Sequence, residues 1–192
     1  GNGQFSRAED VENAPDGSIW VADDGGGRYQ QFSPAGAYQA TVTLASEVAR
    51  GVAVDANGDL LAAVEGGGKS GFRRYTGSGG SWAETGGLFG GEALMRADDI
   101  EASPDGTVYV IRNGSQGGGD WLERYTAAGK LLKKTKLGSG EGTRGIAVDL
   151  DCNVLVSDWA GGGLAKLSPT GKRLAAGTLP YIARDLAVGP KG

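Results

Sequence analysis

A short pattern that recurs five times along the chain constrains its fold more than any other feature. The five segments are Glu9-Asp10-Val11-Glu12, Arg50-Gly51-Val52-Ala53, Asp98-Asp99-Ile100-Glu101, Arg144-Gly145-Ile146-Ala147 and Arg184-Asp185-Leu186-Ala187. Successive segments start 41, 48, 46 and 40 residues apart. Intervals of about 40–50 residues are typical of the four-stranded blades of a β-propeller. We therefore expect a single propeller domain, or part of one, over 1–192, with repeats over about 9–49, 50–97, 98–143 and 144–183 and a partial repeat over 184–192.

The first four repeats share one internal order. A turn sequence such as Pro15-Asp16-Gly17 or Ala56-Asn57-Gly58 precedes an apolar strand such as Val108-Tyr109-Val110. Asp-Gly and Asn-Gly tolerate the positive φ of a tight hairpin, and strands that are apolar on both faces pack between neighbouring blades. The sequence thus predicts an all-β chain: a β-propeller of four-stranded antiparallel blades, with four full repeats and the first strand of a fifth.

Composition excludes several classes of function. The net charge is −4, whereas a nucleic-acid partner requires a basic face. No apolar run approaches the roughly 20 residues of a membrane span, so we expect no membrane insertion. The chain contains no histidine, which excludes Ser-His-Asp and Cys-His catalysis and histidine-ligated metals.

The segment from Arg144 to Asp158, continued by Leu167-Ser168-Pro169-Thr170-Gly171, resembles an NHL repeat, the unit of NHL-type β-propellers. The resemblance extends over the whole chain at the level of repeats, and it implies a propeller. Two departures stand out. Glycine clusters replace the Asn-His-Arg that often follows the second strand, and the histidines on which related propeller lyases depend are missing.

A more distant resemblance is to gluconolactonase-like propellers, which hold a divalent metal with Glu, Asn, Asn and Asp at blade-entry positions. That resemblance implies calcium or another divalent metal as cofactor, with Glu9 and Asp98 as ligands. At the other three comparable positions the chain has Arg50, Arg144 and Arg184, which would repel a cation.

The first residues of the five segments, here called the blade-entry residues, are the candidate ligand-binding positions: Glu9, Arg50, Asp98, Arg144 and Arg184. In a propeller the inner strands line the central channel, so residues in one register converge near the axis. Two interpretations are open. Neighbouring blades neutralise one another through ion pairs, which avoids unpaired buried charge; or the arginines bind carboxylate or phosphate groups of a polar ligand.

Three tryptophans lie near glycine clusters and are candidate anchors for a partner or a sugar ring, namely Trp82, Trp121 and Trp159. The alternative for each is ordinary packing in the core of the propeller.

Two hypotheses for function follow. The first is a non-enzymatic binding or scaffold module, extracellular or on a cell surface, that needs no cofactor and takes a protein or a polar small-molecule ligand. The second is a metal-dependent, lactonase-like hydrolase with its site at the central channel. Because propellers close with about four to eight whole blades, the partial fifth repeat predicts that the remaining blades come from a longer chain or a homo-oligomer.

Overall fold

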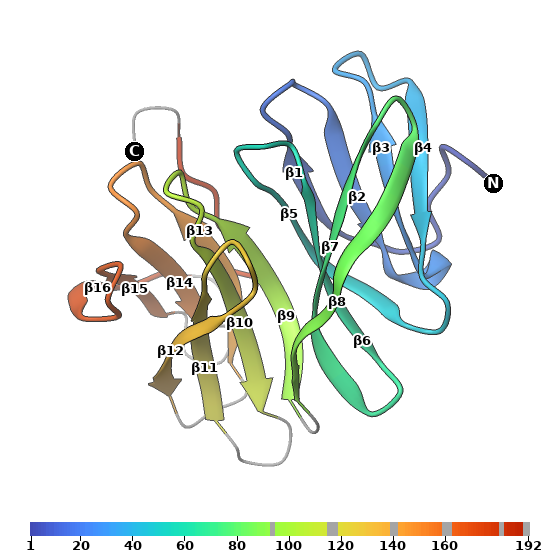
Figure 1. Ribbon diagram of the computed structural model, residues 1–192. Helices are drawn as coiled ribbons and strands as arrows, with labels where there is room; N and C mark the ends of the chain where they lie inside the picture. The colour runs from blue at the N-terminus through green and yellow to red at the C-terminus, as the bar shows by residue number, and fades with distance from the viewer. Residues whose placement is uncertain (93–94, 115–118, 139–141, 159–162, 181–182, 190–192) are drawn as a thin grey trace. The chain divides into compact units, whose positions relative to one another are not determined.

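The computed structural model describes residues 1–192 except 93–94, 115–118, 139–141, 159–162, 181–182 and 190–192. Two compact units divide the chain, one over Gly1–Ile100 and one over Glu101–Gly192, and each is described on its own. Within the described residues, sixteen strands form four sheets, and η1 (Asp24–Gly26) is a single short 3-10 turn (Figure 1). None of the helical structure described here is long and apolar enough to cross a membrane.

Each sheet is one blade, in which the order of hydrogen-bonded strands follows the order of the chain. Blade 1 contains β1 (Ala8–Asn13), β2 (Ile19–Asp23), β3 (Arg28–Phe32) and β4 (Tyr38–Thr43). Blade 2 contains β5 (Val48–Val54), β6 (Leu60–Gly66), β7 (Lys69–Ser78) and β8 (Ser81–Glu92). Blade 3 contains β9 (Met95–Ala102), β10 (Val108–Gly114), β11 (Gly119–Tyr125) and β12 (Leu131–Gly138). Blade 4 contains β13 (Thr143–Val148), β14 (Val154–Asp158), β15 (Gly163–Leu167) and β16 (Arg173–Thr178). The prediction of an all-β propeller with four-stranded antiparallel blades is confirmed.

The first turn of every blade has one residue with positive φ, as the Asp-Gly and Asn-Gly pairs indicate. Gly17, Gly58 and Gly106 occupy this position with φ of 82°, 84° and 82°. In blade 4 the same position is held by Cys152 at φ 60°, the only residue other than glycine with positive φ in the described part of the chain. Blade 4 therefore has the positive φ of this turn without a glycine.

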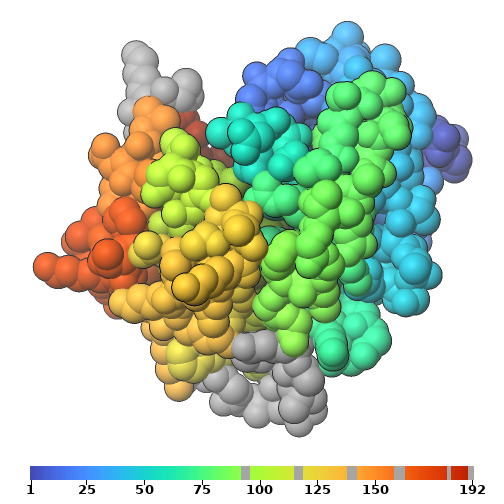
Figure 2. Space-filling model, viewed as in Figure 1, coloured from blue at the N-terminus to red at the C-terminus, as the bar shows by residue number. Residues whose placement is uncertain are grey.

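Blades 1 and 2 share one apolar core in the first unit. Trp20, Tyr29 and Leu60 are fully buried within it. The Tyr29 hydroxyl donates a hydrogen bond to the carbonyl of Ala63, so this buried phenol from blade 1 is satisfied by the backbone of blade 2. The long hairpin of β7 and β8 forms the green ridge of this unit in Figure 2.

The second unit has its own core between blades 3 and 4. Tyr109 and Ile111 from β10 pack with Ile146 from β13 and Val154 from β14, and all four are at most 1% exposed. Strands that are apolar on both faces thus lie where the sequence pattern puts them, between neighbouring blades.

The four full repeats are formed, whereas the described residues 184–189 of the fifth repeat are not in a strand. Among the described strands, none of the four sheets includes this segment. Asp185 nevertheless keeps the packing of the repeat: a Cβ on Gly145 would lie 2.7 Å from its Cα. Its carboxylate accepts a hydrogen bond from the N–H of Leu186 at 2.7 Å.

Candidate functional site: a charge cluster at the blade entries

In the first strands of blades 1, 2 and 4, a β-bulge sets the position of the blade-entry residue. The pairing register shifts between Ala8 and Asp10 in β1, between Ala49 and Val52 in β5, and between Thr143 and Ile146 in β13. Glu9, Arg50 and Arg144 lie inside these shifts. Because a bulge bends the strand and re-aims the unpaired side chain, the repeat places its entry residue outside the regular ladder.

Arg50 is the centre of a set of ion pairs in the first unit. Its Nη2 lies 3.0 Å from Oε2 of Glu65, while its Nη1 lies 3.7 Å from Oδ2 of Asp24 and 4.0 Å from Oε1 of Glu9. The guanidinium thus contacts carboxylates of both blade 1 and blade 2, because its planar group carries several N–H donors that point in different directions.

Two further arginines extend the set in both directions. Arg7 Nε lies 3.1 Å from Oε1 of Glu9, and Arg7 also pairs with Asp24. Arg96 Nη2 lies 2.8 Å from Oδ1 of Asp98, and its Nε lies 3.7 Å from Oε2 of Glu65. We call these connected residues the blade-entry charge cluster: Arg7, Glu9, Asp24, Arg50, Glu65, Arg96 and Asp98.

The cluster has a buried base and an accessible rim. The side chains of Asp24 and Asp98 are 3% and 6% exposed, whereas those of Glu9 and Glu65 are 38% and 37% exposed. Buried carboxylates need a paired cation to offset desolvation, while the exposed pairs at the rim each contribute only about 0–1 kcal/mol. The rim carboxylates are therefore available for exchange with an external partner at low cost.

Asp23, next to the cluster, fixes the segment that carries Arg7. Its buried carboxylate accepts hydrogen bonds from the backbone N–H of Ser6 at 2.8 Å and of Arg7 at 2.9 Å, and pairs with Arg28 at 2.9 Å. Burial opposes ionisation, but the Arg7 and Ser6 amides and the Arg28 guanidinium outweigh it and lower the pKa of Asp23. The carboxylate that holds the cluster's first arginine in place therefore stays ionised to a lower pH than an ordinary aspartate.

The structure brings Glu9, Arg50 and Asp98 into one connected set of ion pairs. Arg144 lies on β13 and Arg184 follows β16, both in the second unit. The four additional members of the cluster were missed by sequence reasoning. Arg96 stands two residues before Asp98 on β9, the spacing that puts side chains on one face of a strand. Arg7 has the same spacing from Glu9 but precedes β1, which begins at Ala8. Glu65 lies near the end of β6, the second strand of blade 2, opposite Val48 at the start of β5. A charged residue at the end of the second strand was therefore the other sequence signal for the cluster.

The carboxylates of the cluster do not fit a divalent metal site. Glu9 is held by Arg7 and Arg50, and Asp98 by Arg96, so each carboxylate already has a cation beside it. A divalent cation would have to displace these arginines or lie against their positive charge. In the parts of the chain described above, no group of three Asp, Glu, Cys or His side chains is arranged to hold a metal ion.

A separate polar network lies buried in blade 3. Arg112 and Glu123 are both fully buried and paired, the Tyr125 hydroxyl also contacts Glu123, and Lys134 Nζ lies 2.7 Å from Glu123 Oε1. Burial opposes ionisation of Glu123, but Arg112, Lys134 and Tyr125 outweigh it and lower its pKa. Arg112 and Glu123 are fully buried and paired with each other, and Lys134, whose side chain is 30% exposed, closes the network toward solvent. We therefore assign this network to the stability of the fold.

The blades, their meander order and the bulged entry strands define the class of this chain: it is a β-propeller protein. Neither a family model nor a curated protein sequence matches it. Solved structures do match. One is a catalytically inactive virginiamycin B lyase from Staphylococcus aureus with quinupristin, at 16% identity and a TM-score of 0.71, covering 96% of this chain and 60% of that one. The chain therefore spans about three-fifths of the length of that structure.

Two other matches have different descriptions. A gluconolactonase from Xanthomonas campestris is 15% identical with a TM-score of 0.58, over 96% of this chain and 80% of that one. A chain of the nidogen–laminin complex is 15% identical with a TM-score of 0.71, over 95% of this chain and 69% of that one. At these identities the likeness is one of fold, shared by two enzymes and a protein in a protein complex.

Proposed function

We propose that this chain is a non-enzymatic β-propeller module that binds a polar partner through the rim of the blade-entry charge cluster. One observation carries the proposal: the carboxylates that a lactonase-like propeller would use for a metal are held by Arg7, Arg50 and Arg96. The absence of histidine in the sequence agrees with it, because the histidine-dependent chemistry of propeller lyases has no equivalent here.

The partner we propose is a protein or a polar small molecule with both acidic and basic groups. Exposed members of opposite sign, Glu9, Glu65 and Arg96, give the rim a mixed charge that favours exchange of ion pairs with such a partner. The nidogen–laminin match is one example of this fold in a protein complex. An NHL-type repeat and a location outside the cell or on its surface are part of the same proposal.

The alternative is a metal-dependent hydrolase of the lactonase kind, which the match to a gluconolactonase favours. It would require Glu9 and Asp98 to leave their arginines and bind the ion. We derive no reaction step through a metal, because the donor set as arranged is neutralised by those arginines.

Turnover of sugar lactones distinguishes the two functions. Hydrolysis of a panel of aldonolactones is followed with Ca²⁺, Mg²⁺ or Zn²⁺ added, for the native chain and for Glu9→Gln and Asp98→Asn. A binding module gives the same background rate in all three proteins. Metal-dependent turnover that both substitutions abolish overturns the proposal in favour of the hydrolase.

The binding function is tested directly with immobilised protein and a defined array of extracellular proteins at low and high salt. A specific partner is expected to lose affinity at high salt and with Glu9→Gln or Glu65→Gln. The matched variant Lys130→Gln, at an exposed turn of blade 3, is expected to bind as the native chain does. An affinity that neither Glu9→Gln nor Glu65→Gln lowers contradicts the proposed binding surface.

A further inference from the structure

The outer strands of blades 3 and 4 lie in two stretches of chain that carry basic residues and no acidic ones. Residues 124–138 and 163–178 together hold eight Lys and Arg residues and no Asp or Glu, although the whole chain has a net charge of −4. In the described part of the chain, carboxylates lie within ion-pair distance of two of these eight, Lys134 and Lys166. The others leave this part of the second unit positively charged: Arg124, Lys130, Lys133, Lys136, Lys172 and Arg173.

Hydrogen bonds hold the two stretches side by side within the second unit. Lys133 Nζ on β12 donates to the carbonyl of Thr170 at 2.7 Å, and Arg124 Nη1 on β11 donates to that of Pro169 at 2.8 Å. Pro169 and Thr170 belong to the turn that leads into β16, so the start of β12 lies beside this turn. The basic residues of the two blades therefore form one continuous surface.

Three leucines are exposed within the same surface. Leu131 and Leu132 on β12 are 42% and 44% exposed, and Leu174 on β16 is 51% exposed. Leu132 and Leu174 occupy the same register in their blades, and each stands two residues after an exposed lysine, Lys130 or Lys172. We call the surface the basic outer edge: Lys130, Leu131, Leu132, Lys133, Lys172, Arg173 and Leu174.

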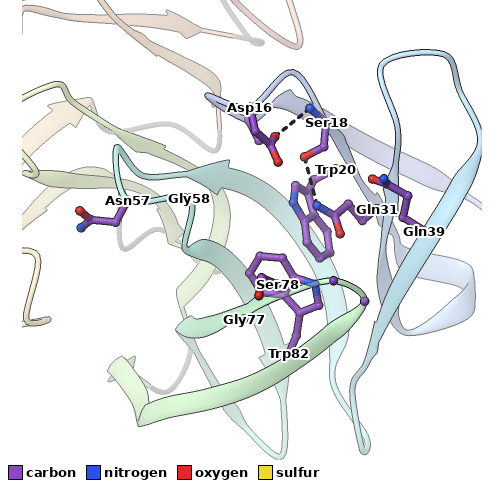
Figure 3. A pocket seen from close by; sticks show the side chains of 13 residues that line it. Asp16, Ser18, Trp20, Gln31, Gln39, Asn57, Gly58, Gly77, Ser78 and Trp82 are labelled. Carbon is purple, nitrogen blue, oxygen red and sulfur yellow. Dashed lines mark hydrogen bonds between the residues drawn. The ribbon is translucent and has the colours of Figure 1, made fainter.

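The exposure of these leucines is a property of their position in the repeat. Blade 1 has Tyr38 and Gln39 at the corresponding positions, and both are exposed on β4, where Figure 3 shows Gln39. Blade 2 packs against blade 1 in a shared core and still does not cover these positions. Blades 3 and 4 thus present leucine and lysine where blade 1 presents a phenol and an amide.

Two of the three candidate tryptophan anchors are held by neighbours within their own unit. Trp82 packs edge to face on the buried Trp20 in the wall of a cavity between blades 1 and 2 (Figure 3). Trp121 on β11 has Lys136 Nζ over its ring, 5.9 Å from the centroid. Trp159 lies outside the described residues. The apolar groups that the basic outer edge offers to a partner are therefore its three leucines.

From this arrangement we propose that the basic outer edge docks on the surface of a bilayer that contains anionic phospholipids. An anionic leaflet attracts each Lys or Arg held close to it. Lysine stems are apolar, so the ammonium groups reach the headgroups while the leucines enter the boundary between headgroups and acyl chains. The contact is peripheral, and it uses no residue of the blade-entry charge cluster.

The position of the leucines favours lipid over an acidic protein. They project from the outermost strands of two sheets, and a fluid lipid surface accepts such side chains without a complementary groove. The exposed Asp105 and Asp151 lie on the turns between the first two strands of their blades, away from this outer edge. The outer edge can therefore approach an anionic surface with its cations and leucines first.

The test is sedimentation of the full chain with vesicles of phosphatidylcholine alone and with about 30% phosphatidylserine added. Binding to the anionic vesicles is expected to exceed binding to the neutral ones at least about tenfold. It is expected to weaken at least about tenfold when the salt is raised from about 0.05 M to about 0.5 M, because salt screens exposed charges. Equal binding to both kinds of vesicle, or binding to neither, overturns the proposal.

Two double variants separate charge from apolar contact. Lys130→Gln with Lys172→Gln is expected to weaken binding about 25-fold, since each lysine near an anionic surface contributes about fivefold. Leu132→Ser with Leu174→Ser is expected to weaken it about tenfold, because the inserted apolar surface is lost. All four side chains are exposed, so both variants keep the fold. The matched control Lys69→Gln, at an exposed lysine of the first unit, is expected to bind as the native chain does.

Soluble poly-glutamate distinguishes a lipid surface from an acidic polypeptide. With the same concentration of negative charge, it is expected to bind the chain much more weakly than the anionic vesicles do, because it offers the leucines no apolar phase. The proposal is overturned in favour of an acidic polypeptide if poly-glutamate binds as tightly as the vesicles, or if the leucine variant binds the vesicles as the native chain does. An equal loss in Lys69→Gln and in the lysine double variant also overturns it, because the attraction then does not depend on the outer edge.

Discussion

The carboxylate of Asp10 accepts a hydrogen bond from the backbone N–H of Val52 at 2.7 Å, which joins the inner strand of blade 1 to that of blade 2. Its other oxygen accepts from the N–H of Val11, also at 2.7 Å. One oxygen thus serves the backbone of its own strand and the other that of the next blade. Asp10 therefore couples the first two repeats.

Removing this carboxylate is expected to loosen the junction between the first two blades. Asp10→Ala is predicted to lower the free energy of unfolding by about 1–2 kcal/mol, because the buried N–H of Val52 loses its acceptor. Asp10→Asn keeps one acceptor oxygen and is expected to cost about half as much. Urea denaturation measures the change, with Asp151→Asn at an exposed turn as the control. Equal stability of Asp10→Ala and the control contradicts this role.

Cys152 is strained where the other blades have glycine. Its φ of 60° costs an L-residue about 1–2 kcal/mol. Glycine would remove this strain, but the greater conformational entropy of glycine in the unfolded chain cancels part of the gain. Cys152→Gly is therefore predicted to raise the free energy of unfolding by about 0.5–1 kcal/mol. The reverse change, Gly58→Ala, tests the same strain, because a Cβ there meets no atom within 4 Å. A loss of stability in Cys152→Gly, measured by denaturant midpoint, runs against the prediction.

Asp149 gives the stability of blade 4 a dependence on acid. Its burial opposes ionisation, but hydrogen bonds from Lys166 and Asn153 outweigh it and lower the pKa to about 2 from 3.8. A carboxyl whose pKa is depressed in the folded state adds stability that is complete above its unfolded pKa and lost as the pH falls through about 2.

The difference in stability between the native chain and Asp149→Asn is thus expected to be about 1 kcal/mol at neutral pH, reduced from the full linkage value because Lys166 is partly exposed. It is expected to shrink between about pH 4 and pH 2. Thermal unfolding at a series of pH values measures it, and a difference that is constant over this range argues against the assignment.

The buried pair in blade 3 is expected to matter chiefly when one member is removed. Arg112→Met leaves Glu123 charged and buried with Lys134 as its main cation, and is predicted to cost about 3–5 kcal/mol. The double variant Arg112→Met, Glu123→Leu is expected to recover most of that loss, since both charges are gone. Denaturation of the two singles and the double gives the coupling; additive losses would show that the pair is not a unit.

The repeats determine how much of the fold and of the candidate site could be predicted from the sequence. Blade number, strand order and the turn glycines follow from a pattern that is written four times, so a local departure such as Cys152 does not hide it. Four members of the blade-entry charge cluster were missed because Arg7 and Arg96 stand beside an entry position, Glu65 lies near the end of the facing strand, and Asp24 lies in η1. Only the folded chain brings them to Glu9, Arg50 and Asp98. Trp20 and Trp82 pack edge to face but are 62 positions apart in sequence, and no local pattern joins them.

The claim that arginines, rather than a metal, hold the carboxylates at the blade entries is tested most directly by calorimetric titration of the dialysed protein with Ca²⁺. The arrangement of Arg7, Arg50 and Arg96 predicts no saturable binding up to about 1 mM Ca²⁺, the weak end of protein calcium sites. Binding of one equivalent of Ca²⁺ that Glu9→Gln and Asp98→Asn abolish would contradict it.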